Sequence, residues 1–93
     1  MENVLKEAIK HYGKDMQITV AIEELSELIK ELCKAKRGML NQDHVAEEIA
    51  DVRIVLEELM IIFDNKHRVS NWYNAKLRRL GDRIKRESKY ETR

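Results

Sequence analysis

The fold is decided by residues 43–63, which read DHVAEEIADVRIVLEELMIIF. At about 100° per residue on a helix, Val52 and Leu59 fall on one side, and Ile54 and Ile61 fall on nearly the opposite side. We therefore expect one long helix with apolar residues almost all round. Since a small bundle cannot cover both sides of such a helix, the pattern predicts an obligate homo-oligomer, at least a dimer.

The composition of the whole chain favours the same all-α architecture. The 93 residues contain no proline and only three glycines, and 38% of them are charged, which is typical of long helices joined by few loops. We expect a single domain, residues 1–93, folded as a bundle of about four helices. The expected helices span residues 3–12, 15–37, 44–63 and about 70–88.

Residues with capping preferences mark the ends of these helices. Asp15 and Asp43 are the predicted N-caps of the second and third helices, and Ser70 or Asn71 is the predicted N-cap of the fourth. Gly38 is predicted to end the second helix, because glycine readily adopts the left-handed conformation found just after helices.

The chain carries no sign of secretion or membrane insertion. Its amino terminus lacks the basic and then apolar pattern of a signal peptide, and Val52–Phe63 is too short and too charged to span a bilayer. The single cysteine, Cys33, excludes an intramolecular disulfide and a metal site of the cysteine type. We expect a soluble cytoplasmic protein with Cys33 in its core.

Charge is distributed unevenly along the chain. Residues 1–64 carry 8 Lys/Arg against 14 Asp/Glu, whereas residues 65–93 carry 10 against 3. The basic end favours binding to phosphate groups, or it forms a solvated face. Nucleic acid is not an expected partner, because the acidic body would repel a phosphate backbone and no helix-turn-helix spacing is present.

Two pairs of carboxylates stand at three-residue spacing. Glu24 and Glu27 form one pair, and Glu48 and Asp51 form the other, so each pair occupies one side of a helix. Glu48 and Asp51 also point toward the apolar sector around Val55. Carboxylates placed there need a compensating partner, which is either a Lys/Arg in a buried ion pair or a hard cation such as Mg²⁺.

Together these pairs resemble the signature of the MazG-like, all-α nucleoside triphosphate pyrophosphohydrolases. The match lies in Glu23-Glu24-x-x-Glu27, followed after twenty residues by Glu48-x-x-Asp51, and the similarity covers roughly residues 15–80. The resemblance implies a helical bundle assembled as a dimer or a tetramer. It also implies hydrolysis of a nucleoside or deoxynucleoside triphosphate to the monophosphate and pyrophosphate, with Mg²⁺ as cofactor and Mn²⁺ as a possible substitute. By position, it implies that the Mg²⁺ ligands are Glu24, Glu27, Glu48 and Asp51, with Glu23 as a further catalytic candidate.

The resemblance also extends to the basic fourth helix. Lys76 and Arg79 are the candidates for holding the substrate phosphates, although Leu80 stands where the family often has Asn. The sequence does not indicate a metal site made of histidines, because no two of His11, His44 and His67 stand at metal-ligand spacing. Each is expected at the surface or at a helix end. Two alternatives stay open: a phosphoribosyl-ATP pyrophosphohydrolase, and a non-enzymatic helical interaction module.

Overall fold

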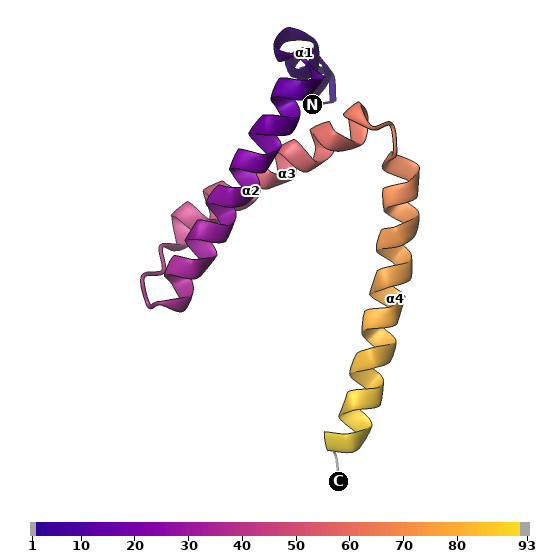
Figure 1. Cartoon of the computed structure of the whole chain (residues 1–93). Helices are drawn as coiled ribbons and strands as arrows, with labels where there is room; N and C mark the ends of the chain where they lie inside the picture. The colour runs from indigo at the N-terminus through magenta and orange to yellow at the C-terminus, as the bar shows by residue number, and fades with distance from the viewer. Residues whose placement is uncertain (1, 92–93) are drawn as a thin grey trace.

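A computed structural model describes residues 2–91 of the chain, and within that range it contains four α-helices and no strand. This confirms the all-α prediction. The helices, which Figure 1 shows in order along the chain, are α1 (Glu2–Tyr12), α2 (Lys14–Lys36), α3 (Gln42–Ile62) and α4 (Lys66–Glu91).

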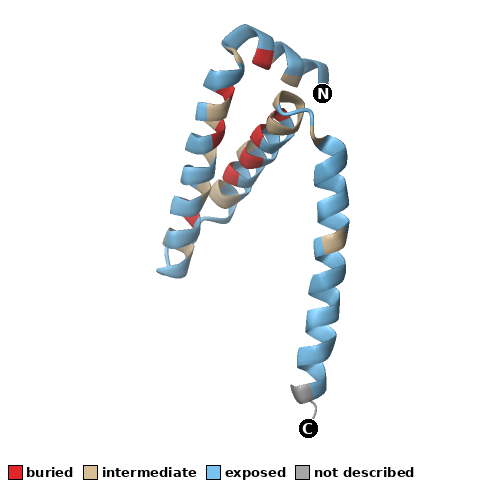
Figure 2. Cartoon of the chain, turned by 45° about the vertical axis from the view of Figure 1, so that its right-hand side comes forward, coloured by how far each residue is buried: buried red, intermediate tan, exposed pale blue. Residues whose placement is uncertain are grey.

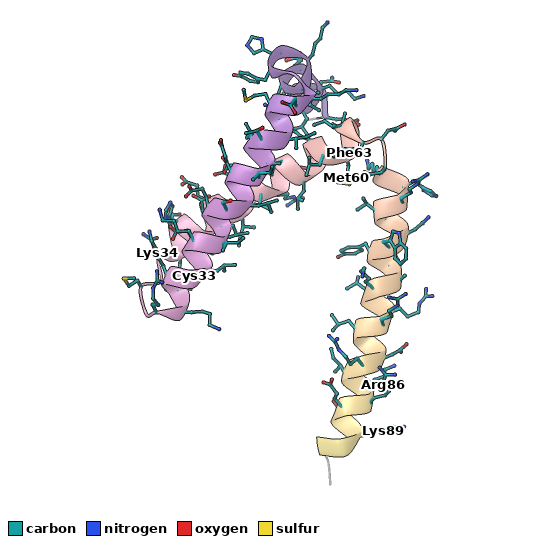
Figure 3. All side chains as sticks on the ribbon, viewed as in Figure 1. Cys33, Lys34, Met60, Phe63, Arg86 and Lys89 are labelled. Carbon is teal, nitrogen blue, oxygen red and sulfur yellow. The ribbon has the colours of Figure 1, made fainter. Side chains whose placement is uncertain are left out.

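The first three helices pack together, and the fourth leaves them. α2 and α3 form an antiparallel hairpin, and α1 lies across its open end in contact with both (Figure 1). Among the described residues, α4 contacts only α3. Met60 and Phe63 lie near the α3–α4 junction, while Arg86 and Lys89 lie toward the far end of α4 (Figure 3).

The helix ends explain the hairpin. Gly38 follows α2 with φ of +83°, and the Met39 N–H donates to the Lys34 carbonyl at 2.9 Å, which closes the last turn as a Schellman motif. The predicted stop at Gly38 is confirmed. Asp64 takes the same left-handed position after α3, with φ of +50°, and the Asn65 N–H donates to the Met60 carbonyl at 3.2 Å.

The predicted N-caps were wrong. α2 begins at Lys14 without a side-chain cap, because Gly13, with φ of +92°, joins it directly to α1 and leaves Asp15 inside the first turn. Asn41 caps α3 instead of Asp43, since its Oδ1 accepts from the His44 N–H at 3.0 Å. α4 begins at Lys66, so neither Ser70 nor Asn71 caps it.

The core between the helices is thin. Its buried apolar residues are Ile9, Ala21, Val52 and Val55, and as many polar residues are buried beside them: Gln17, Glu31, Glu48 and Glu58 (Figure 2). The predicted core position of Cys33 was wrong, because its side chain is exposed. Apolar residues therefore remain on the surface in excess of what three packed helices can cover.

The molecule is extended for its length. Its radius of gyration is 17.4 Å, whereas a compact chain of this size has roughly 12 Å. The difference arises from α4, which is exposed along almost its whole described length (Figure 2). None of the helices in the described range combines the length and apolar character that crossing a bilayer requires.

Candidate metal centre

Three of the predicted ligands meet across the α2–α3 hairpin. Glu24 on α2 and Glu48 and Asp51 on α3 each offer a carboxylate oxygen, and these oxygens lie within 4.8 Å of one another. The antiparallel packing of α2 and α3 brings them together. It places Glu24 opposite Asp51 and, further along the hairpin, Glu31 opposite His44. We call this group the carboxylate cluster.

Burial and mutual repulsion destabilise the charged form of the carboxylate cluster in the absence of a cation. Burial, followed by the negative charges of Asp51 and Glu48, raises the pKa of Glu24 above its ordinary value of 4.5. Burial and the charge of Asp51 likewise raise the pKa of Glu48, although the neighbouring His44 acts in the opposite direction. A divalent cation would offset the repulsion among the carboxylates, which is the second cause of both shifts after burial.

The alternative of a buried ion pair with Lys or Arg has no support around this cluster. Among the described residues, no Lys or Arg forms an ion pair with Glu24, Glu48 or Asp51. Glu48 is only 7% exposed, and its Oε2 is buried without a hydrogen-bond partner in the described part of the chain. A buried carboxylate oxygen without a donor is costly, and a metal ion would satisfy it.

The other two acids of the motif lie at the margin. Glu27 is exposed and outside the 4.8 Å group, but its charge contributes to raising the pKa of both Glu24 and Glu48, which places it nearby. Glu23 is also exposed. Assignment of Glu27 as a ligand and of Glu23 as a catalytic group therefore stays a prediction.

A second constellation adjoins the cluster, and the sequence did not reveal it. His44, in the first turn of α3, is half-buried and lies between helices: its Nδ1 is 2.9 Å from Glu31 Oε1, and its Nε2 is 3.4 Å from Glu48 Oε1 and 3.7 Å from Glu47 Oε1. Glu31 is only 3% exposed and also contacts Lys34 Nζ at 3.4 Å. Figure 3 shows Lys34 in the last turns of α2.

The expectation that His44 is an ordinary helix-end histidine was therefore incomplete. It lies at a helix end, but its imidazole joins a buried acid of α2 to a buried acid of α3. The available sequence signal was the four-residue spacing from His44 to Glu48, which places both side chains on one side of α3. The partner Glu31 comes from another helix and could not be inferred from spacing.

The candidate phosphate ligands lie apart from the carboxylate cluster within one chain. Lys76 and Arg79 lie on α4, where they line a shallow basic hollow with Arg83 and Arg86. The Lys76 Nζ lies 5.9 Å from the centre of the Trp72 ring, a cation–π contact. Because α4 makes no contact with α2, a phosphate role for these residues requires α4 to meet a carboxylate cluster in another way.

Comparison with known proteins does not extend the assignment. A scan against protein-family models, a search of curated proteins and a search of solved structures each found no match. The resemblance to MazG-like enzymes therefore depends on the motif residues and on the site geometry that they form.

Proposed function

We propose that the protein is a Mg²⁺-dependent nucleoside triphosphate pyrophosphohydrolase of the MazG-like type. The observation that carries the proposal is the carboxylate cluster: three carboxylates from two helices converge within 4.8 Å, and no Lys or Arg in the described range compensates them. Bound Mg²⁺ would polarise phosphate oxygens and lower the pKa of a water molecule.

The chain's own residues would supply position and charge. The rigid hairpin holds Glu24 level with Asp51, so a triphosphate bound through cations at the cluster would be fixed relative to both helices. Glu27, at the exposed margin, is suited to contact a cation on the substrate side. Lys76 and Arg79 are suited to stabilise the departing pyrophosphate, because Arg offers paired donors to phosphate oxygens.

We further propose that the working form is an oligomer in which α4 of one chain docks on α2 of a second copy. Two exposed apolar stripes with the same alternating three- and four-residue spacing support this arrangement. The α2 stripe consists of Ile22, Leu25, Ile29 and Leu32, and the α4 stripe consists of Tyr73, Leu77, Leu80 and Ile84. Such spacing is typical of helices that pack lengthwise.

The exposed area favours a second copy as the occupant. The chain exposes 8088 Å², against roughly 5,700 Å² for a compact protein of this mass. The excess, roughly 2,400 Å² per chain, is of the size that obligate homodimers bury.

The test of the reaction is a panel of standard and modified nucleoside and deoxynucleoside triphosphates incubated with the purified full chain and Mg²⁺. We expect pyrophosphate and the monophosphate from at least one substrate, and no release in EDTA. The Glu48→Gln variant should be inactive, while Glu57→Gln, an exposed acid on the same helix, should retain activity.

Two results would contradict the proposed reaction. Orthophosphate as the first product would exclude attack between the α and β phosphates. Full activity in EDTA, or in the Glu48→Gln variant, would exclude the carboxylate cluster as the reacting site. A protein that turns over no triphosphate in any condition would leave the helical interaction module as the better description.

A further inference from the structure

The two ring nitrogens of His44 have the surroundings that are typical of a metal-binding histidine. Such a histidine holds a carboxylate at one ring nitrogen, which fixes the ring and the proton, and presents the other nitrogen to the metal. Here Glu31 lies 2.9 Å from Nδ1 and is itself buried, so it favours a proton on that nitrogen. Nε2 is left facing Glu47 and Glu48.

A positive charge at Nε2 would stabilise this convergence, in which Glu48 is buried and Glu47 is exposed. Oxygens of Glu47 and Glu48 and a nitrogen of His44 lie within 4.8 Å of one another, so one lone pair and two carboxylates share a small volume. The charge can be a proton on the imidazole or a metal ion. The Glu48 side chain is more than nine-tenths buried, and its second oxygen, Oε2, has no hydrogen-bond partner in the described residues. A metal ion at Glu48 would satisfy this oxygen, whereas a proton on the imidazole, which lies against Oε1, leaves it unpaired.

We propose that His44, Glu47 and Glu48 form a second cation site, which adjoins the carboxylate cluster through Glu48. The donor set is one imidazole nitrogen and two carboxylate oxygens. Imidazole nitrogen favours Mn²⁺, Co²⁺ or Zn²⁺ over Mg²⁺, which prefers oxygen ligands alone. Three protein ligands leave coordination positions open to water or to a phosphate oxygen.

Glu31 is the positioning residue of this site. Its carboxylate is shared between His44 and Lys34, and because it is buried at 3% exposure it cannot swing into solvent. Loss of an orienting carboxylate behind a metal-bound histidine typically weakens metal binding about 10- to 100-fold. We expect a loss of that size for Glu31→Gln.

Cobalt is a suitable probe, because its visible absorption spectrum responds to nitrogen ligation. The full chain, stripped of metal and of any affinity tag, is titrated with Co²⁺ in the presence of excess Mg²⁺. We expect one Co²⁺ per chain that Mg²⁺ does not displace. The His44→Gln variant should lose at least about 10-fold in Co²⁺ affinity, while His67→Gln, which changes a histidine outside both groups, should bind as the unmodified protein does.

A measurement on the unmodified protein makes the test independent of variant folding. With Mn²⁺ bound, electron spin-echo spectroscopy should detect ¹⁴N of an imidazole, and the signal should persist in His67→Gln. Absence of the nitrogen signal, or equal Co²⁺ affinity in His44→Gln, would overturn the second site. If His44→Gln also melts at a lower temperature in EDTA while binding Co²⁺ unchanged, the imidazole is a protonated bridge between Glu31 and Glu48.

The second site and the proposed reaction can fail separately. Co²⁺ bound through His44 without release of pyrophosphate would keep the site and reject the reaction. Mg²⁺-dependent release of pyrophosphate without nitrogen ligation of Mn²⁺ would keep the reaction and reject the site.

Discussion

At the residue scale, Asp51 distinguishes a cation site from a structural ion pair. Asp51→Asn removes one charge from three crowded carboxylates, so metal-free protein should melt at the same or a higher temperature. We expect turnover to fall at least about 100-fold, the scale of losing one essential contact in the transition state. If Asp51 instead compensates a buried cation, the variant should lose roughly 3–5 kcal/mol of unfolding free energy in EDTA.

Glu58 provides a second residue-scale test at a distance from the carboxylate cluster. Glu58 is 4% exposed, its Oε2 lacks a hydrogen-bond partner among the described residues, and burial raises its pKa above 4.5. The folded state therefore holds the Glu58 proton more tightly than the unfolded state does. Its contribution to stability is fully present below pH 4.5 and is lost as the pH rises through the raised pKa.

The expected result is a change in the pH dependence of stability. Glu58→Gln should be more stable than the unmodified protein at pH 7.5, by about 1–3 kcal/mol, because it removes an unpaired buried charge. The two proteins should converge as the pH falls toward 4.5. Glu57→Gln, an exposed neighbour, should follow the unmodified curve. Denaturation at several pH values measures all three, and parallel curves for Glu58→Gln would contradict the argument.

At the element scale, two glycines should respond to the same substitution with opposite sign. Gly38 has φ of +83° and Gly81 lies within α4, and a Cβ at either would meet no atom within 4 Å. The strain that alanine would cause at Gly38 therefore comes from the positive φ alone, and not from a clash. We expect Gly38→Ala to lower the unfolding free energy by about 1–2 kcal/mol. We expect Gly81→Ala to make the free energy of forming α4 more favourable by about 1 kcal/mol. Circular dichroism and denaturation check both.

Local sequence signals were sufficient for the helices but not for their contacts. Gly38 marked the end of α2, because a left-handed residue after a helix is a local requirement. The cap of α3 was misplaced because Asn41 and Asp43 are both good caps, and only the backbone shows that Asn41 Oδ1 accepts from His44. The pairing of Glu31 with His44 depends on how α2 and α3 align, which no local pattern contains.

The same distinction applies to the apolar faces. Leu25 and Leu32 recur at the spacing of a packed helix face, yet both are exposed. The buried residues of α2 include Ala21 and Glu31, and Glu31 contacts His44 of α3. The buried side of α2 therefore carries both apolar and charged residues. Hydrophobic spacing predicts that a face will be covered, but it does not say which helix, or which copy of the chain, covers it.

At the scale of the whole molecule, the exposed stripes predict a stable oligomer. Light scattering at micromolar concentration should give a multiple of 11.1 kDa. Leu80→Asp, in the α4 stripe, should shift the mass toward the monomer and lower activity, because it places a charge in an apolar contact. Asn71→Asp adds the same charge on the opposite side of α4 and should leave the mass unchanged. A monomeric unmodified protein would contradict the docking of α4.

The position of α4 has a consequence for hydrogen exchange. This helix has 26 residues and is roughly 39 Å long, and its helical form in a free chain depends mainly on short-range interactions along itself. Such helices open often, so the backbone amides of α4 should exchange with solvent deuterium much faster than those between α2 and α3. If α4 docks on a second copy as proposed, exchange of its amides should slow together in the oligomer, and the protected segment would identify the docked surface residue by residue.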